Sequence, residues 1–312
     1  MAGRDFDVPR GYYWPNMAIH RDIEARQDFW TGYQPGFRAS GQRPGSPEFY
    51  AEVERHRYEL EPGTPEIADF GSWGGKDVLE CGCGIATDGM QFIRAGARYT
   101  GMDFSPTAIE LARERVATAG FDATFVHASI ADMPFEDESF DLVYSMGVIH
   151  HLPETEHVVE EMFRVLRPGG EARVMIYHRS SLNYWFSIMV VRRLLAGLLL
   201  VPGMPGVVAK LTGEPADVIE GHRQLLRDHG LSYLTDSALF LSHNTDGPGN
   251  PLSKVYTRKT GAAMFLRFTQ VDTHVRFLNL RAYPVIRRWG NSRIARWLGD
   301  RYGWHLWICA RK

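Results

Sequence analysis

Apolar and polar positions between residues 77 and 178 alternate in a way that predicts strands and helices in turn. Short apolar runs have the length of buried strands, and longer segments between them carry apolar side chains at helical spacing. A regular alternation of this kind implies a parallel sheet with helices on both faces. The predicted strands lie at residues 78–80, 98–102, 123–127, 140–146 and 171–177. Three helices are predicted between them: one that begins after Thr87 or Asp88 as its cap, one that begins after Ser105, and one at residues 154–166.

The first 76 residues carry a different pattern, because seven prolines divide a polar and aromatic sequence into short pieces. Helices are predicted at residues 17–30 and 47–60, the second with Ser46 as its cap. An aromatic group, Tyr12, Tyr13 and Trp14, precedes both helices. This group either packs against the body of the protein or belongs to a lid over a ligand site.

Residues 179–256 depart from the alternation of strand and helix and are predicted to be an insertion. Their most apolar stretch is Tyr184–Val201, but Arg192 and Arg193 interrupt it before it reaches the ~20 residues that span a bilayer. A cap helix that packs on the core and forms a hydrophobic pocket is preferred here over a helix on a membrane surface. The remaining predicted elements are a helix at 257–268 and strands at 270–277 and 303–310.

Composition narrows the class of protein. The chain has 312 residues and a net charge of -2, without a Lys/Arg tract, so a nucleic-acid partner is not expected. Its three cysteines cannot build a disulfide framework, and Cys81 and Cys83 lack the spacing of a zinc site. The N-terminus has no apolar core of a signal peptide, which favours a cytoplasmic protein.

A glycine-rich turn after the first predicted strand is the strongest chemical signal. Gly82 and Gly84 alternate with other residues in the segment CGCGIA, and Asp103 stands at the tip of the next strand. Glycine has no Cβ, so the chain can turn tightly and a ligand can lie against bare backbone. A strand, a glycine loop, a helix and a strand with an acid about 20 residues after the glycines are typical of a nucleoside-binding unit.

The segment from Glu80 onward resembles motif I of the class I S-adenosylmethionine (SAM) methyltransferases, which has the pattern Glu-x-Gly-x-Gly. A dinucleotide-binding fingerprint would have a third glycine at the position that Thr87 occupies, so this chain lacks part of that pattern. Three later segments, HASIADMPF (127–135), EDESFDLVY (136–144) and RVLRPGG (164–170), are similar to that family's later motifs in order and spacing. The most similar subgroup is that of the ubiquinone and menaquinone biosynthesis methyltransferases.

The resemblance implies an α/β, Rossmann-like class I methyltransferase fold. Its sheet has seven strands, mostly parallel, with an antiparallel last strand. The chain then divides into an N-terminal helical or lid segment (1–76), a SAM-binding core (77–178), an inserted substrate cap (179–256), and the closing helix and antiparallel strands of the core (257–312).

The resemblance also implies how the cofactor SAM, and its product S-adenosylhomocysteine, would be held. Gly82 and Gly84 let the backbone approach the methionine part, Asp103 accepts both ribose hydroxyls, and Phe104 stacks on adenine. Two positions depart from the family: Ala86 replaces a glycine, in a loop expected to need no positive φ there, and Ser129 replaces an acid that binds the adenine amino group. The further expected cofactor residues are Glu80 (ammonium, through water), Thr87, Asp88, Ile130 and Met146.

The segment after the fourth predicted strand carries the candidate catalytic residues. His150 and His151 lie where the family places residues near the reacting methyl group, and a histidine there can take a proton from an acceptor. Tyr177 ends the fifth strand at the same rim, where open α/β sheets bind ligands. The expected substrate wall consists of Tyr177, Asn183 and Trp185, joined by Tyr12, Tyr13 and Trp14 if a lid closes.

These features favour a SAM-dependent methyltransferase of specialised (natural-product) metabolism. Its acceptor is a hydrophobic small molecule, aromatic, terpenoid or polyketide-like, methylated at oxygen, nitrogen or carbon by in-line displacement. The alternatives are a cyclase or pericyclase on the same fold and a non-catalytic SAM-binding protein. No metal is expected, although His243, Asp246 and Asn250 form a polar group in one loop. A membrane partner is not expected, and a homo-oligomer is an open alternative.

Overall fold

The centre of the fold is a seven-stranded sheet with the strand order β3-β2-β1-β4-β5-β7-β6. The computed structural model describes residues 22–32, 39–278 and 293–312. Neighbouring strands from β1 to β5 run parallel, whereas β7 runs antiparallel to both β5 and β6. The predicted class I fold is therefore confirmed. The strands are β1 Asp77–Cys81, β2 Arg98–Asp103, β3 Thr124–His127, β4 Phe140–Met146, β5 Leu166–Tyr177, β6 Gln270–Arg276 and β7 His305–Arg311.

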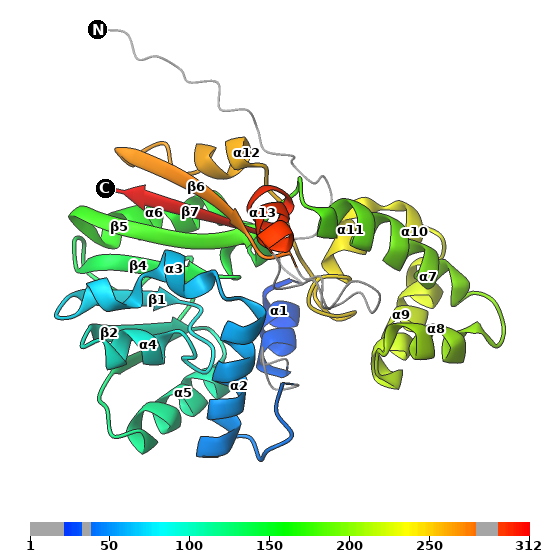
Figure 1. The fold of residues 1–312 in the computed structure, drawn as a ribbon, viewed down its shortest axis with the longest axis horizontal. Helices are drawn as coiled ribbons and strands as arrows, with labels where there is room; N and C mark the ends of the chain where they lie inside the picture. The colour runs from blue at the N-terminus through cyan, green and yellow to red at the C-terminus, as the bar shows by residue number, and fades with distance from the viewer. Residues whose placement is uncertain (1–21, 33–38, 279–292) are drawn as a thin grey trace, which may run out of the picture.

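Helices surround this sheet, and a separate group of them, α7 to α11, lies beside it at the end of the molecule away from the C-terminus (Figure 1). The helices before β5 are α1 Asp22–Gly32, α2 Pro47–Leu60, α3 Thr64–Ala68, η3 Phe70–Trp73, α4 Gly89–Arg94, α5 Pro106–Thr118, η4 Ile149–His151 and α6 Thr155–Val165. Those after it are η5 Asn183–Arg192, α7 Arg193–Leu198, α8 Met204–Thr212, α9 Ala216–His229, α10 Ser232–Thr235, α11 Ser237–Ser242, α12 Arg258–Ala263 and α13 Arg293–Tyr302.

Local sequence signals account for several helix boundaries. The Ser46 hydroxyl accepts a hydrogen bond from the N–H of Phe49, and the Ser105 hydroxyl accepts one from Ala108, so both predicted caps are confirmed. The helix predicted at 257–268 is wrong in length, because α12 ends at Ala263. Turns follow, and they place Phe265 and Phe268 in the core. The first five residues of the helix predicted at 17–30 lie outside the described residues.

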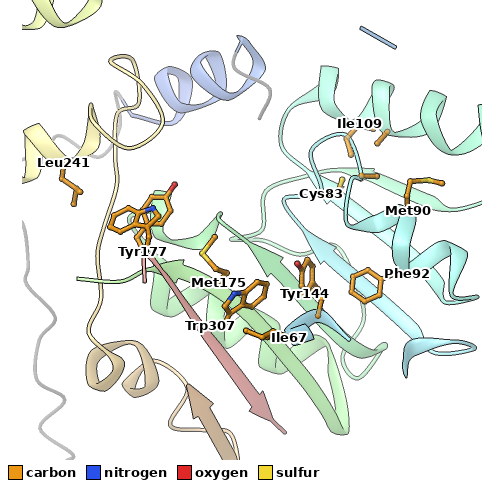
Figure 2. Packing of buried hydrophobic residues seen from close by; sticks show 14 of the residues in the cluster. Ile67, Cys83, Met90, Phe92, Ile109, Tyr144, Met175, Tyr177, Leu241 and Trp307 are labelled. Atoms are coloured by element: carbon orange, nitrogen blue, oxygen red, sulfur yellow. The ribbon is translucent and has the colours of Figure 1, made fainter. Parts of the chain in front are cut away.

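Two apolar clusters cover the two faces of the sheet. Successive residues of a strand point to opposite faces, so Val78 belongs to one cluster and Leu79 to the other. On the first face the Tyr144 ring lies between Phe92 and Trp307, with ring centroids 5.3 and 5.9 Å away (Figure 2). The same cluster continues into the helices beside the sheet, which therefore share a core with it.

The apolar stretch 184–201 folds as two consecutive helical pieces. The first, η5, is a π-helix, and the second, α7, is α-helical. Tyr184 and Ile188 of η5 are buried in the shared core, whereas Trp185 and Phe186 are exposed. Within the described ranges, the helices are too short or too polar for any of them to cross a bilayer.

The Trp307→Ala substitution tests the first cluster. Trp307 is fully buried on β7, so losing its indole should lower the free energy of unfolding by about 3–5 kcal/mol. Urea unfolding followed by circular dichroism measures this value. Trp297→Ala on α13, where the side chain is 60% exposed, is the matched control and should change stability by about 0.5 kcal/mol or less. Equal losses in the two variants would contradict the assigned core.

Candidate active site

The glycine loop leaves β1 at the carboxyl end of the sheet and turns through two glycines with positive φ, Gly82 at 76° and Gly84 at 51°. A Cβ on Gly82 would lie 2.4 Å from Cγ2 of Val148, so the loop packs too closely there for any side chain. The N–H groups of Gly82 and Cys83 both donate to the carbonyl of Met102, at 2.8 and 3.0 Å. These bonds tie the loop to the end of β2.

Ala86 corrects one sequence prediction. The loop was expected to need no positive φ at this position, but Ala86 has φ 54°. A left-handed conformation costs a non-glycine residue roughly 1–2 kcal/mol. The Ala86 methyl group is fully buried in the first apolar cluster, and this burial offsets part of the cost.

Asp103 stands at the tip of β2 and links that strand to the loop. Its two carboxylate oxygens accept N–H groups of Gly84 and Ser105, each at 2.9 Å. Burial raises the pKa of Asp103, and these backbone hydrogen bonds oppose the rise. The remaining lone pairs can accept further donors, because a carboxylate offers about four acceptor positions.

A cavity of about 500 Å³ lies between the loop, α2 and the ends of β4 and β5. This volume is in the range of small-molecule sites. Of the predicted cofactor residues, six line it: Glu80, Gly82, Gly84, Thr87, Asp88 and Met146.

The other predicted cofactor residues lie beyond this cavity. Asp103 is joined to it through Gly84, and the Phe104 carbonyl accepts hydrogen bonds from Gln27 and His127. Ser129 is exposed and Ile130 is buried. The structure therefore separates the residues expected around the nucleoside from those expected around the methionine part.

Acidic side chains dominate the wall of the cavity around α2. Glu61, Glu80 and Asp88 line it together with the guanidinium of Arg57. Arg57 lies 3.0 Å from the Asp88 carboxylate and 3.4 Å from that of Glu61. Burial and the neighbouring Asp88 raise the pKa of Glu80, and burial raises the pKa of Glu61. The three carboxyl groups outnumber the one guanidinium, so this wall favours a ligand that carries positive charge.

Tyrosine hydroxyls stabilise these acids. Tyr58 and Tyr144 donate to the Asp88 carboxylate at 2.8 and 2.9 Å, and Tyr99 donates to Glu80. The side chain of Asp88 does not cap α4, so that predicted role is wrong, because its oxygens are engaged by Arg57 and the two tyrosines. Two cysteines of the loop region, Cys81 and Cys83, are buried free thiols whose pKa is raised by burial.

At the other side of the cavity, Tyr177 and Asp246 form part of the wall. The Tyr177 hydroxyl donates to both carboxylate oxygens of Asp246, at 3.0 and 3.1 Å. Its ring stacks on Trp304 with centroids 4.3 Å apart. The two predicted catalytic histidines are buried behind this wall: the His150 ring lies 3.9 Å from that of Tyr177, and Nε2 of His151 lies 3.5 Å from Asp246.

The tautomer of His151 follows from its neighbours. Its Nδ1 lies 2.7 Å from the carbonyl of Leu252, which cannot donate, so Nδ1 carries a proton. In the neutral ring Nε2 then carries no proton, and its lone pair faces the Asp246 carboxylate. Two acceptors face each other there, and one added proton would complete a hydrogen bond between them. Burial lowers the pKa of His151, and Asp246 opposes this shift.

His150 has a different environment. Neither ring nitrogen finds a hydrogen-bond partner among the described residues, and the ring is fully buried. Burial and the neighbouring His151 lower the pKa of His150 well below that of an ordinary imidazole. Of the two histidines, His151 is therefore the one whose ring lies beside a carboxylate that can accept a proton, that of Asp246.

The predicted substrate wall is only partly brought together. Tyr177 lines the cavity, but Asn183 and Trp185 do not, and Trp185 is 56% exposed. Tyr12, Tyr13 and Trp14 lie outside the described residues. In the predicted polar loop, Asn250 donates to Asp246, whereas the His243 ring lies beside Tyr233. The residues of the described ranges form no group of three or more side chains suited to a metal ion.

Sequence reasoning did not assign Arg57 or Asp246 to the ligand site, although both line the cavity. Arg57 comes from α2 and reaches the carboxylate of Asp88, 31 residues further along the chain, at 3.0 Å. Asp246 was grouped with a metal-like loop, and only the folded chain brings it to Tyr177 and His151. No local signal could have found these contacts, because each joins segments dozens of residues apart.

Comparisons with known proteins agree with this geometry. Residues 78–170 match the family described as "Methyltransferase domain". A probable phthiotriol/phenolphthiotriol dimycocerosates methyltransferase 2 of Mycobacterium ulcerans is 41% identical over 121 residues, which are 38% of this chain and 45% of that protein. The 27-O-demethylrifamycin SV methyltransferase of Amycolatopsis mediterranei is 34% identical over 99 residues, 31% of this chain and 36% of the relative. The match thus spans less than half of either relative.

The fold is also similar to that of a solved structure. The 1,6-didemethyltoxoflavin-N1-methyltransferase of Burkholderia thailandensis, with bound 1,6-didemethyltoxoflavin and S-adenosylhomocysteine, aligns with a TM-score of 0.51 at 15% identity, covering 96% of this chain and 92% of that one. The fold implied by the resemblance to SAM-dependent methyltransferases is confirmed, and residues 78–170 match a methyltransferase domain. These relatives do not single out the ubiquinone and menaquinone subgroup.

The Gly82→Ala substitution tests the close packing of the loop. The added methyl group would collide with Val148 and would require an L-residue at φ 76°, so the melting temperature should fall by several degrees. Differential scanning calorimetry measures the shift. Gly96→Ala is the control, because Gly96 has φ 85° and open space around it, so this variant measures only the cost of placing an alanine at a positive φ. The double variant Gly82→Ala/Val148→Ala should regain part of the loss, and an absence of regain would contradict the assigned contact.

Proposed function

Because residues 78–170 form a class I methyltransferase domain, we propose that this chain transfers a methyl group from SAM to a hydrophobic small molecule. The observation that carries the proposal is the cavity, which joins the bare glycine loop and buried acids at one side to the Tyr177–Asp246 pair at the other. One side suits a charged nucleoside cofactor, and the other suits an acceptor that must lose a proton.

The residues present fit SAM. When bound, SAM supplies an electrophilic methyl group on a sulfonium ion. Glu80 and Asp88 lie where an ammonium or sulfonium charge is favoured, and Arg57 can bind a carboxylate. The loop around Gly82 and Gly84 lets backbone groups approach the ligand, and Asp103, just beyond, offers acceptors for ribose hydroxyls.

Asp246 and His151 are proposed to take the proton from the acceptor hydroxyl or amine. Asp246 faces the cavity, and His151 stands behind it with a free lone pair at Nε2. Since the pair can hold one further proton, the acceptor becomes a better nucleophile without releasing that proton to water. Tyr177 orients the Asp246 carboxylate through its hydroxyl. The other part of catalysis is positioning and the exclusion of water.

The acceptor class follows from the wall beside this pair. Trp30, Tyr177, Phe277 and Trp304 present aromatic surface to the cavity. The names of the relatives, which specify phthiotriol or phenolphthiotriol dimycocerosates, demethylrifamycin and didemethyltoxoflavin, support a natural-product acceptor. In this proposal residues 12–14 belong to a lid and residues 179–256 to a substrate cap. A cytoplasmic location remains a prediction of the sequence.

A methyl-label experiment tests the function as a whole. The purified chain is incubated with SAM labelled at its methyl group and with a panel of aromatic and polyketide acceptors. Label in an acceptor product is the expected result. A product without label would favour the alternative of a cyclase, and cofactor binding without any product across the panel would favour a non-catalytic protein.

The Asp103→Ala substitution tests the placement of the ribose. The variant loses hydrogen bonds to a charged group, which are worth about 1.5–3 kcal/mol, so the Kd for SAM should rise roughly 10- to 150-fold. Isothermal titration calorimetry measures the Kd. Asp132→Ala, which removes an exposed carboxylate of a neighbouring loop, is the control and should leave it unchanged. An unchanged Kd in the Asp103 variant would contradict the placement.

The Asp246→Asn substitution tests the proton-accepting pair. The turnover number should fall by about 10²–10⁴-fold, the usual contribution of a general base. The activity of the unaltered chain should be present at neutral pH and be lost as pH falls through the lowered pKa of His151. Because Asp246 raises that pKa, its removal should move the acid limb of kcat/KM to lower pH.

The control for this prediction is Asp272→Asn on β6, an exposed carboxylate far from the cavity wall. It should leave both the turnover number and the pH profile unchanged. An Asp246 variant with full activity and an unmoved acid limb would show that the pair takes no proton from the acceptor.

A further inference from the structure

Asn250 lies at the end of the loop that carries Asp246, and its side chain is fully buried. A buried amide needs acceptors for its two N–H hydrogens and a donor for its oxygen, because hydrogen bonds left unmade away from water are costly. The mechanism above gives this residue no role. The partners that it finds nevertheless lead to both members of the proton-accepting pair, Asp246 and His151.

The amide nitrogen of Asn250 contacts the Asp246 side of the pair. Its Nδ2 donates to Oδ2 of Asp246 at 3.3 Å, and the same oxygen lies 3.5 Å from Nε2 of His151. Nδ2 also donates to the hydroxyls of Thr245 and Ser253, at 3.1 and 2.9 Å, so its two hydrogens are shared among three acceptors. The amide thereby holds the carboxylate oxygen that faces the imidazole ring.

The amide oxygen of Asn250 is linked to the His151 side of the pair through Leu252. Oδ1 accepts the N–H of Leu252 at 3.3 Å, and the Leu252 carbonyl accepts the Nδ1 proton of His151 at 2.7 Å. The hydroxyl of Ser253 lies 3.2 Å from the same Nδ1, and a hydroxyl is able to donate as well as accept. The atoms around Nδ1 therefore include one that requires a proton there and one that does not.

Two neutral tautomers of His151 compete in this network. With the proton on Nδ1, the ring donates to Leu252, and Nε2 keeps the lone pair that faces Asp246. With the proton on Nε2, the ring would donate to Asp246 and accept at Nδ1 from Ser253. That second tautomer removes the lone pair at Nε2 with which the pair holds the proton of the acceptor. The position of the Leu252 carbonyl decides between the two.

We propose that Asn250 is the positioning residue of the proton-accepting pair. It holds the Asp246 carboxylate toward His151 and, through the backbone of Leu252, keeps the His151 proton on Nδ1. Asn250 is absent from the described residues that line the cavity, so it acts through the pair and not on the acceptor. The inference rests on the proposed function, because the role of the pair in methyl transfer is itself proposed.

Nitrogen-15 NMR of the His151 ring tests the proposal whether or not the chain transfers a methyl group. The full-length chain is labelled at its histidine nitrogens, and the variant His151→Gln identifies the signals of His151 by their loss. We expect the proton on Nδ1 in the unaltered chain. In Asn250→Ala the Leu252 carbonyl is no longer held, so the population should move toward the Nε2–H tautomer.

Asn244→Ala is the matched control, because Asn244 is also a buried amide of this region and is only 4% exposed. Its Nδ2 donates to the Tyr233 hydroxyl at 2.9 Å and to the Phe240 carbonyl at 2.8 Å. Among the described residues, these side-chain bonds reach neither member of the pair. The control variant should therefore leave the His151 tautomer unchanged, although it also loses buried hydrogen bonds.

The turnover number gives a second readout. Asn250→Ala should lower kcat by about 10- to 100-fold, because small misplacements of a reacting group cost rate, and it should leave the Kd for SAM unchanged. Since Asn250 acts through Asp246, the double variant Asn250→Ala/Asp246→Asn should be no slower than Asp246→Asn alone.

Circular dichroism melting confirms that each variant is folded. The proposal is overturned if the unaltered chain carries the His151 proton on Nε2, a result that needs no Asn250 variant. It is also overturned if Asn250→Ala leaves the tautomer or kcat unchanged, or if the losses in the double variant are additive. A chain without methyl transfer would contradict the proposed function, and the NMR comparison would still decide whether Asn250 holds the pair.

Discussion

The crowding of three acids beside one arginine is the constraint on which the rest of the site depends. Charged groups are costly to remove from water, so Glu80 and Asp88, which are buried, and Glu61, which is partly buried, require partners at the end of the sheet. Arg57 and the tyrosine hydroxyls supply some of these partners, and they come from α2 and from strands β2 and β4. The described wall still favours added positive charge, which is what a sulfonium cofactor brings.

The sequence predicted those parts of the site that depend on the local conformation of the backbone and on spacing along the chain. Gly82 has to be glycine because its φ is positive and Val148 fills the space of a side chain. Asp103 was predicted from its distance along the chain after the glycines, and the strand β2 brings it back to the loop. The alternation of apolar runs predicted the parallel core, because each strand and helix there carries its own periodic signal.

The remaining parts depend on contacts between distant segments, which periodicity cannot reveal. Asp246 meets Tyr177 and His151 only because the chain returns to the sheet after the helical group. The histidines were expected at the cavity wall, but they are buried one layer behind it. Ala86 adopts a positive φ although its residue type argued against one, and its buried methyl group shows that tertiary packing outweighs local preference.

A crystal structure with S-adenosylhomocysteine would show whether this site holds the cofactor. We expect the homocysteine part to lie between the glycine loop, Glu80 and Arg57, the ribose to reach Asp103, and the sulfur to face the side of the cavity formed by Tyr177 and Asp246. Ligand density outside this cavity, or a ligand-bound chain in which protein side chains fill the open space beside Gly84, would contradict this placement.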